Sequence, residues 1–217
     1  MGAKAWFAAY YNHDPKGVLS NKPELDREAC ISLAKKLLPG VTLQEKEDGS
    51  LDVLNPGKQE VFVGVYGDLK IVAHEDLGGD FPSHVDGNWR SAELGSTTYI
   101  HATHSVVDWC AFALWQGGEL VRALSVSPDG GVQEDIGNKL PFEAPYWDGS
   151  FALEDEFDDD DDEPYPLPFH PLELSEAALL AMLGFQFEGD TDDWVCDPVE
   201  IPIMKFEISK NAWWKFW

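Results

Sequence analysis

The sequence predicts an α+β fold, a mainly antiparallel sheet with two or more helices packed on one of its faces. Short runs of β-branched and aromatic residues recur along the chain, several of them are joined by Gly-containing turns, and two stretches have a clear helical pattern. The chain has 217 residues, of which 44% are hydrophobic, so it can bury the core of one domain. We therefore expect residues 1–217 to form a single domain.

The chain is expected to open with a strand, a loop and a helix. Lys4 to Asn12 has aromatic residues for both faces, which indicates a central strand covered on two sides. Residues 23–38 begin with a proline, carry acids in the first turn and lysines in the last, and have an apolar stripe. Pro39-Gly40 ends this helix, and we expect its stripe to pack on the sheet.

Two hairpins are expected next. Residues 41–55 alternate around Asp48-Gly49, and residues 60–74 do so around Gly67-Asp68. From residue 75 to 96 the composition turns to Gly, Asp, Ser and Asn, which predicts a long irregular connection of the kind that often carries function.

Residues 97–127 are the part around which we expect the chain to fold. They contain three β-rich runs, TTYIHATH, WCAFALWQ and ELVRALSVS. Gly117-Gly118 supplies the positive φ angles of a type I′ or II′ turn, and the short SVVD link lets the first run pair with the second. This stretch therefore predicts a three-stranded meander.

The last third of the chain is expected to contain a helix and a final strand. Ser175-Glu176 open the helix and Gly184 stops it. VEIPIMKFEIS predicts the strand, and its Pro202, which has no N–H to donate, indicates an edge position or a bulge.

Two further segments have an unusual composition. Residues 154–163, EDEFDDDDDE, bring like charges together and predict a mobile acidic tract. Residues 211–217, NAWWKFW, form an aromatic tail that exposes apolar bulk unless it docks on the body or on a partner. We expect partner binding through both segments, by Asp158, Asp159, Asp160, Asp161, Asp162, Trp213 and Trp214.

The charge of the chain restricts its partners. Fifteen basic and forty acidic residues give a formal net charge of −25. Such a field repels nucleic-acid phosphates and anionic lipids, so we expect neither a nucleic acid nor a membrane as partner. It attracts basic proteins, although acidity can also serve solubility alone. Without the nine acids of residues 154–163 the charge is still −16, so the acidity is global.

Cysteine usage and hydropathy indicate a cytoplasmic protein. Cys30, Cys110 and Cys196 lie far apart without a CxxC pair, which argues against a zinc ribbon, a redox motif or a disulfide framework. No segment approaches the roughly 20 apolar residues of a membrane span, and the N-terminal apolar run is too short for a signal peptide.

One spacing suggests a metal site. His101, His104 and Asp108 follow the pattern H-x2-H-x3-D, which on a helix would offer two imidazoles and a carboxylate to a divalent metal. On a continuous strand, however, His101 and His104 point to opposite faces. A bend between His104 and Asp108 would restore a site, with His170 or the acidic tract as a further donor. We favour two half-buried histidines, each hydrogen-bonded to a neighbour, and expect no cofactor.

Other reactive residues lack the context of a catalytic site. Ser105 follows His104 but has no G-x-S-x-G elbow around it, and Cys110 lies within an apolar strand where a thiol is inert. No Walker A, GxGxxG or EF-hand pattern occurs. Arg122 is expected to form an ion pair, with Glu119, Glu134 or Asp135 as its partner.

Several motifs occur together in one order: MGAK, HATHSVVDW, LVRALSVSPDGGVQEDIG, LPFEAPYW, the acidic tract and PYPLPFHPLELSEAAL. In this combination the chain resembles a family of uncharacterised bacterial proteins known only as a domain of unknown function. The resemblance covers most of the chain but not the NAWWKFW tail. It implies a bacterial, cytoplasmic protein of one domain and no particular activity.

Two functions remain open at this point. The first is an acidic protein-interaction module, for instance an immunity-like or antitoxin-like inhibitor or an adaptor that captures a basic protein. The acidity, the exposed aromatic candidates and the lack of a catalytic constellation favour it. The alternative is a metal-dependent enzyme that uses His101, His104 and Asp108 with a divalent metal.

Overall fold

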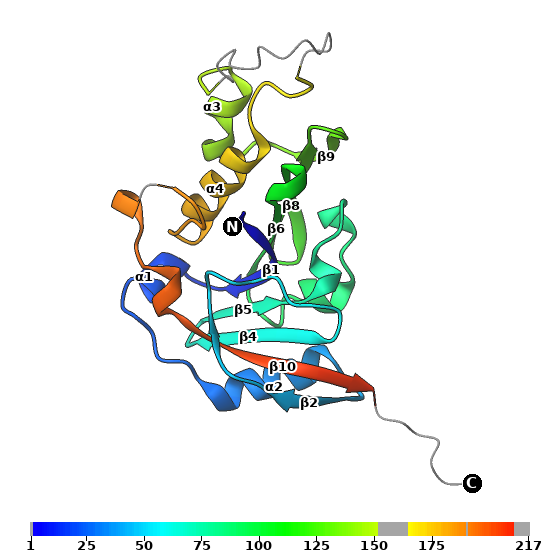
Figure 1. The fold of residues 1–217 in the computed structure, drawn as a ribbon, viewed down its shortest axis with the longest axis vertical. Coiled ribbons are helices and arrows are strands. Elements are labelled where there is room, and N and C mark those ends of the chain that lie inside the picture. The colour runs from blue at the N-terminus through cyan, green and yellow to red at the C-terminus, as the bar shows by residue number, and fades with distance from the viewer. Residues whose placement is uncertain (1, 152–164, 190, 211–217) are drawn as a thin grey trace, which may run out of the picture.

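The computed structural model describes residues 2–151, 165–189 and 191–210, and these form one ten-stranded sheet with helices around it (Figure 1). All pairings between the named strands are antiparallel. The strands are β1 (Lys4–Tyr11), β2 (Val41–Glu45), β3 (Gly49–Ser50), β4 (Glu60–Tyr66), β5 (Leu69–Ala73), β6 (Thr97–His104), β7 (Trp109–Gln116), β8 (Glu119–Ser127), β9 (Gly131–Gly137) and β10 (Pro202–Lys210). The class predicted from the sequence, a largely antiparallel sheet with a few helices, is confirmed.

Four α-helices and seven short 3-10 turns connect the strands. The α-helices are α1 (Pro15–Leu19), α2 (Arg27–Leu37), α3 (Ala144–Trp147) and α4 (Pro171–Met182). The 3-10 turns are η1 (Glu75–Leu77), η2 (Pro82–His84), η3 (Gly87–Arg90), η4 (Ser105–Val107), η5 (Pro141–Glu143), η6 (Thr191–Asp193) and η7 (Pro198–Glu200). These numbers refer to the described residues, in which no helix is long and apolar enough to cross a membrane.

The strand order is β2-β10-β4-β5-β1-β6-β7-β8-β9, with β3 also paired to β10. The first strand, β1, lies in the middle between β5 and β6, as its apolar sequence predicted. The meander is confirmed as β6-β7-β8, and β9 extends it to the edge of the sheet. At the turn between β7 and β8, Gly117 and Gly118 both have positive φ, 58° and 85°.

The expected hairpin of residues 41–55 is wrong. Both β2 and β3 pair with β10 instead of with each other, with Leu43 opposite Ile208 and Gly49 opposite Ile203. The last strand therefore has neighbours on both sides and does not lie at an edge. Pro202 is its first residue, a position that tolerates a missing N–H.

The helices cover both faces of the sheet, so the expectation that they share one face is wrong. Successive residues of β1 point to opposite faces: Phe7 packs in one core with Leu174 of α4, and Ala8 packs in another with Leu33 of α2. We call these the α4-side core and the α2-side core. Because β1 is buried on both faces, a single layer of helices would have left one of these apolar surfaces in water.

Both long helices begin at a different residue from the one predicted. Asp26 accepts the N–H of Ala29 and thereby caps α2, so Pro23 lies before the helix. His170 caps α4 through Nδ1, and Pro171 occupies its first turn, four residues before Ser175. The predicted stop at Gly184 is confirmed, because this glycine has a φ of 82°.

Candidate functional site

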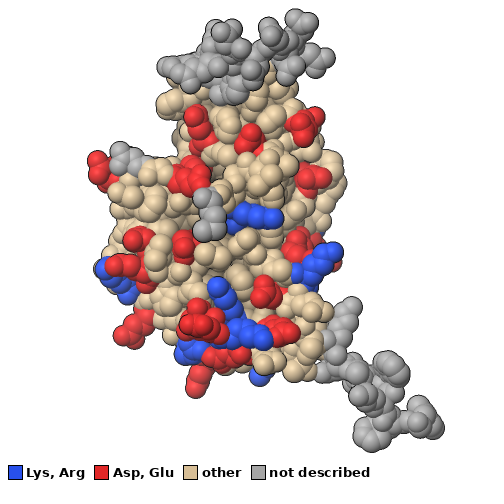
Figure 2. All heavy atoms as spheres, viewed as in Figure 1, with Lys and Arg blue, Asp and Glu red and all other residues tan. Residues whose placement is uncertain are grey.

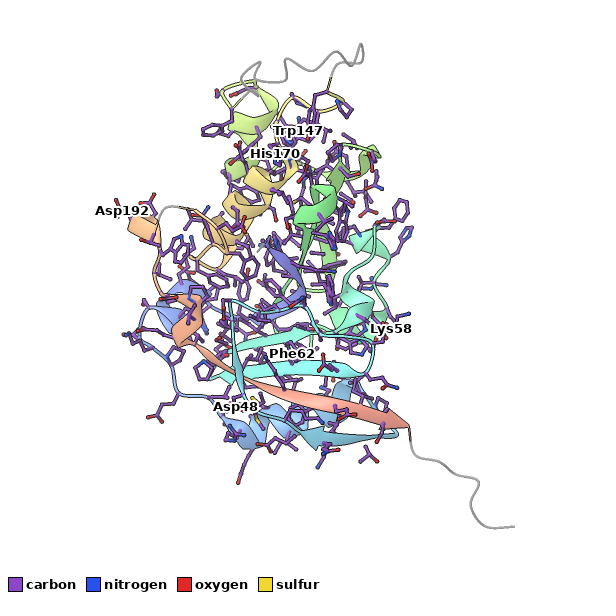
Figure 3. The ribbon with its side chains drawn as sticks, viewed as in Figure 1. Asp48, Lys58, Phe62, Trp147, His170 and Asp192 are labelled. Carbon is purple, nitrogen blue, oxygen red and sulfur yellow. The ribbon has the colours of Figure 1, made fainter. Side chains whose placement is uncertain are left out.

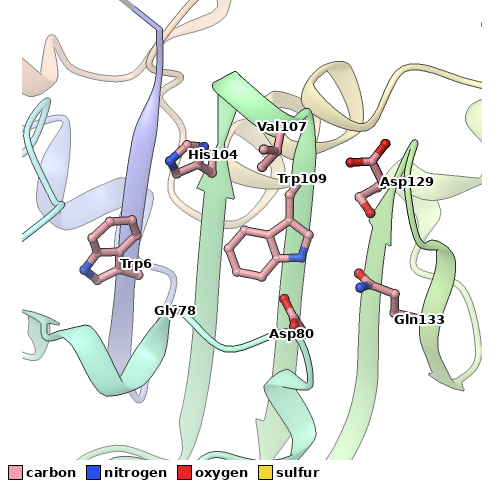
Figure 4. Close-up of a pocket in the computed structure, with 9 residues that line it drawn as sticks. Trp6, Gly78, Asp80, His104, Val107, Trp109, Asp129 and Gln133 are labelled. Carbon is pink, nitrogen blue, oxygen red and sulfur yellow. The ribbon is translucent and has the colours of Figure 1, made fainter.

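A cleft opens on the α2 side of the sheet, at the end where β6 turns into β7 (Figure 4). Its volume is about 280 Å³. The lining residues come from β1, β6, β7, the β8-β9 hairpin and the segment after η1; they are Trp6, Gly78, Asp80, His104, Val107, Trp109, Ser127, Asp129 and Gln133. We call this site the tryptophan cleft.

Strand register explains why two tryptophans meet there. Trp6 pairs with Ala102 and Trp109 pairs with His104, so the side chains of Trp6, His104 and Trp109 share one face. Ala102 and Ala111 are directly opposite each other on β6 and β7, and both pack with the two indoles. Their small side chains leave a shallow place on the sheet, over which the indoles lie.

Hydrogen bonds hold both indoles in place. Trp6 Nε1 donates to the carbonyl of Pro56 at 3.2 Å, and Trp109 Nε1 donates to Ser125 Oγ at 3.1 Å. Ser125 Oγ in turn donates to Gln133 Oε1 at 3.2 Å. The N–H groups are thus used inside the protein, which leaves the aromatic faces as the surfaces that a ligand can contact.

A glycine forms part of the third wall of the cleft. A Cβ atom at Gly78 would lie 3.3 Å from Trp6 Cγ, a tight contact, so the absence of a side chain at this position lets the η1 segment approach the indole closely. Asp80 follows on the same segment, and Asp129 and Gln133 lie on the far side of Trp109 (Figure 4).

The cleft is negatively charged. Asp80 and Asp129 contribute carboxylates, and none of the described lining residues is a lysine or an arginine. Just outside it, the Lys4 ammonium lies 5.2 Å from the centre of the Trp6 ring. His104 Nδ1 is buried and has no hydrogen-bond partner among the described residues. Aromatic faces, carboxylates and a spare imidazole nitrogen together suit a cationic N–H donor.

The protein as a whole is also acidic, with forty acidic and fifteen basic residues. In the view of Figure 2, acidic side chains are spread over the whole face, while basic ones occur mainly in its lower half among acids. Several exposed basic residues already pair with acids: Lys22 with Glu200, Arg27 with Glu45 and Asp48, Lys36 with Glu93, and Lys46 with Glu207. The excess of acids is therefore left without basic partners.

The structure separates the three residues of the proposed metal site. His101 faces the α4-side core, where its Nδ1 lies 2.8 Å from Tyr99 Oη and its Nε2 lies 3.2 Å from Ser175 Oγ. It is fully buried, and burial lowers the pKa of His101 to about 3, so the ring is neutral at pH 7. His104 faces the tryptophan cleft on the opposite side of the sheet.

Asp108 lies in the turn between the two strands. Its backbone is left-handed, with a φ of 45°, and its Oδ2 is 3.8 Å from Nε2 of His170, which stands at the start of α4 (Figure 3). No group of three His, Cys, Asp or Glu residues in the described part of the chain is arranged to hold a metal. The turn at Asp108 does not bring His101, His104 and Asp108 together, so the bend that a metal site would have needed is not present among these residues.

The outcome for the other candidate residues differs. The prediction of two half-buried histidines, each hydrogen-bonded to a neighbour, is wrong in part. His101 is hydrogen-bonded but fully buried, and His104 has a ring nitrogen without a partner among the described residues. The expected burial of Cys110 is confirmed, and this burial raises the pKa of its thiol to about 12, which disfavours the reactive thiolate. Arg122 pairs with Asp135, as predicted, and with Glu143, which was not predicted. Asp158, Asp159, Asp160, Asp161, Asp162, Trp213 and Trp214 lie outside the described residues.

Sequence reasoning missed the cleft itself. Trp6 and Trp109 read as ordinary strand residues, and Asp80 and Asp129 as loop residues. The available signal was the alternation of Trp6 and Trp109 with small alanines, since alanine beside tryptophan on two strands leaves room that a core would normally fill.

Comparison with known proteins adds a family but no activity. No curated protein and no solved structure matches the chain. The model of DUF6928, a family of unknown function, matches residues 5–206, which confirms the resemblance carried by the sequence motifs. This match includes all strands of the sheet except the first residue of β1 and the last residues of β10, and it includes every residue of the tryptophan cleft. The chain therefore belongs to the DUF6928 family.

Proposed function

We propose that this protein is an acidic protein-interaction module that captures a basic protein and takes one of its basic side chains into the tryptophan cleft. The observation that carries the proposal is the composition of the cleft. Two indoles with fixed N–H groups and two carboxylates surround a space that no described basic residue lines. A guanidinium or ammonium group complements that arrangement.

Each part of the cleft has a role in this recognition. An aromatic face attracts a cation by about 0.5–1 kcal/mol at an exposed site and about 2 kcal/mol when the cation is desolvated. Asp80 and Asp129 are exposed, so a direct ion pair of either carboxylate with the partner's cation contributes little to binding. Their larger contribution is the negative electrostatic potential that they create in the cleft. When Nε2 of His104 carries the proton, its buried Nδ1 can accept one N–H of a guanidinium.

The net charge of −25 acts before contact. A strongly negative surface steers a basic partner toward the protein and raises the association rate, and it does so less at high salt because ions screen the field. An immunity-like or antitoxin-like inhibitor, or an adaptor for a basic protein, would use both effects. We place this activity in the bacterial cytoplasm, in line with three cysteines that are all free.

The metal-dependent enzyme has less support. His101 and His104 lie on opposite faces of β6, and His101 already has a partner on each ring nitrogen. A shared metal ion would require the sheet to rearrange, because neither ring can reach the other side of a paired strand.

The test uses a peptide with one arginine, acetyl-Gly-Gly-Arg-Gly-Gly-amide, and the same peptide with neutral citrulline. Binding is followed through the indole N–H resonances of the ¹⁵N-labelled protein, with Trp6→Phe and Trp109→Phe to identify their two signals among those of the nine tryptophans. We expect saturable shifts of the Trp6 and Trp109 signals with the arginine peptide and none with citrulline. Asp80→Asn with Asp129→Asn should weaken this binding several-fold.

The matched control is Glu24→Gln with Glu28→Gln, which removes the same charge beside α2, away from the cleft. If this control weakens binding as much as Asp80→Asn with Asp129→Asn does, only the net charge matters. If the arginine peptide shifts neither indole signal, the proposed site is wrong.

A further inference from the structure

We infer that a second cavity beside the tryptophan cleft continues the same binding surface, so that the partner presents an extended segment with two basic residues, one for each cavity. This inference rests on the proposed function of the cleft. It adds a second site and a spacing that the cleft alone does not require.

The second cavity lies around the start of β1 and has a volume of about 470 Å³. Besides β1, its walls come from the segment between β3 and β4 and from residues 187–199. Three carboxylates line it, those of Asp52, Glu188 and Asp197, together with the aromatic rings of Phe187 and Trp194. The combination of aromatic rings and acids is the same as in the tryptophan cleft.

Internal hydrogen bonds give this cavity a defined shape. The N–H of Phe187 donates to Glu176 Oε2 of α4 at 2.8 Å, and Trp194 Nε1 donates to Gln186 Oε1 at 3.1 Å. Asp197 Oδ1 accepts the N–H of Val199 at 3.0 Å and thereby caps η7. The walls are therefore held by the fold, and Glu188 is the acid for which the described part of the chain shows no side-chain hydrogen bond.

Lys4 joins the two cavities. It lines the second cavity, and its ammonium lies over the ring of Trp6, which lines the first. Residues two apart on a strand lie about 7 Å from each other, so the two cavities adjoin each other at the start of β1. Lys4 is also the one basic residue among the described residues that line either cavity.

The Lys4 contact identifies the chemistry of the ligand independently of the acids. A cation of the protein itself already occupies the outer face of Trp6, at 5.2 Å from the ring centre. The five carboxylates of the two cavities face one ammonium, which leaves an excess of four negative charges for a partner to neutralise. A segment with two basic residues halves that excess, whereas a single basic residue leaves most of it.

The partner segment is expected to be extended. Cavities whose nearest lining residues are about 7 Å apart match basic residues separated by one to three others in an extended chain, which advances about 3.3 Å per residue. A helix advances only about 1.5 Å per residue. Basic residues with the same separation in sequence would therefore lie closer together in a helix and would match the two cavities less well.

The test is a series of peptides, Arg-(Gly)n-Arg with n of 1, 3, 5 and 10, acetylated and amidated, titrated into the full chain by calorimetry. The single-arginine peptide serves as reference. We expect the best spacing, n of 1 or 3, to bind about tenfold more tightly than the reference, because the second contact becomes intramolecular. The gain should fall at n of 10. Glu188→Gln with Asp52→Asn should remove the gain while the single-arginine peptide still shifts the Trp6 and Trp109 indole signals of the cleft.

The outcomes separate this inference from the proposed function. If every two-arginine peptide binds within twofold of the reference, or if the gain survives Glu188→Gln with Asp52→Asn, the second cavity is not part of the site. If the single-arginine peptide itself does not bind, or ignores Asp80→Asn with Asp129→Asn, the proposed function fails instead. The spacing series needs only the unaltered protein, so it decides the matter even if a variant does not fold.

Discussion

Arg122 and Glu143 form an ion pair in which both side chains are fully buried, with 2.7 Å between Nη2 and Oε2. Arg122 belongs to β8, and Glu143 belongs to η5, so the pair fixes the segment before α3 to the sheet. Glu143 also accepts two bonds from Arg122 Nε and one from the N–H of Leu140. The carboxylate is thus held by several donors at once.

Glu143→Ala should therefore be strongly destabilising. Removing Glu143 leaves the buried guanidinium with Asp135 as its one carboxylate partner among the described residues, beside the carbonyls of Ala123 and Ile136. Such losses cost about 3–5 kcal/mol of unfolding free energy. Urea denaturation measures the loss. Glu93→Ala, which breaks the exposed pair with Lys36, is the control and should cost about 1 kcal/mol or less. Equal losses in the two variants would contradict a structural role for the buried pair.

The turn between β7 and β8 depends on two glycines with positive φ, 58° at Gly117 and 85° at Gly118. Replacing both by valine should lower the unfolding free energy by about 1 kcal/mol or more, because β-branched residues resist this backbone region. The urea midpoint gives the result. Gly79→Val is the control, since its site is open and its φ is not in that region. A midpoint unchanged by the double substitution would show that the turn does not need glycine.

Lys4 competes with the partner for the face of Trp6. Lys4→Met should strengthen binding of the single-arginine peptide about two- to fivefold, the equivalent of one exposed cation-π contact. Calorimetric titration measures the change. Lys139→Met also removes one charge and one such contact, at 4.1 Å from the ring of Trp147, and should leave binding nearly unchanged. The same gain in both variants would assign the effect to net charge.

Glu176 makes stability depend on pH. Burial, which outweighs the N–H groups of Phe187 and Glu188, raises the pKa of Glu176 to about 7 from its ordinary value of 4.5. Between these values the folded protein binds a proton that the unfolded chain has released. The stability from this group is therefore complete below pH 4.5 and is lost as the pH rises through 7, by an amount on the order of 3 kcal/mol.

Glu176→Gln keeps the neutral form and should remove that decline. The measurement is the difference in unfolding free energy between Glu176→Gln and the wild type at pH 4.5, 5.5, 7 and 8, which should shift in favour of the variant as the pH rises. Glu28→Gln, an exposed substitution on α2, provides the control and should show a constant difference. A constant difference for Glu176→Gln as well would mean that the carboxyl group titrates normally.

Local chemistry in the sequence determined several parts of this fold. Positive-φ glycines specify the turn at Gly117-Gly118 and the end of α4 at Gly184, because residues with a side chain adopt that backbone much less readily. The two-sided apolar pattern of β1 specified a central strand, because both of its faces have to be buried. These features depend on neighbours within a few residues and can be read without the rest of the chain.

Pairing between distant segments was decided only by the tertiary structure. β10 takes its place between β2 and β4, more than 130 residues away in sequence, and no local pattern records that choice. The predicted hairpin around Asp48-Gly49 fits the local sequence. In the structure, however, β2 forms a longer ladder of strand pairs with β10 than the two-residue strand β3 could offer. The second layer of helices follows from the same long-range pairing, which creates two apolar faces to cover.

The candidate site belongs to this second class. Trp6 and Trp109 are more than 100 residues apart, and they meet because β1, β6 and β7 are neighbours in a register that places Ala102 and Ala111 beneath both indoles. The same register sends His101 to one face and His104 to the other, since side chains alternate along a strand. The sequence alone determined which residues are aromatic, acidic or basic, and the strand register decided which of them share a surface.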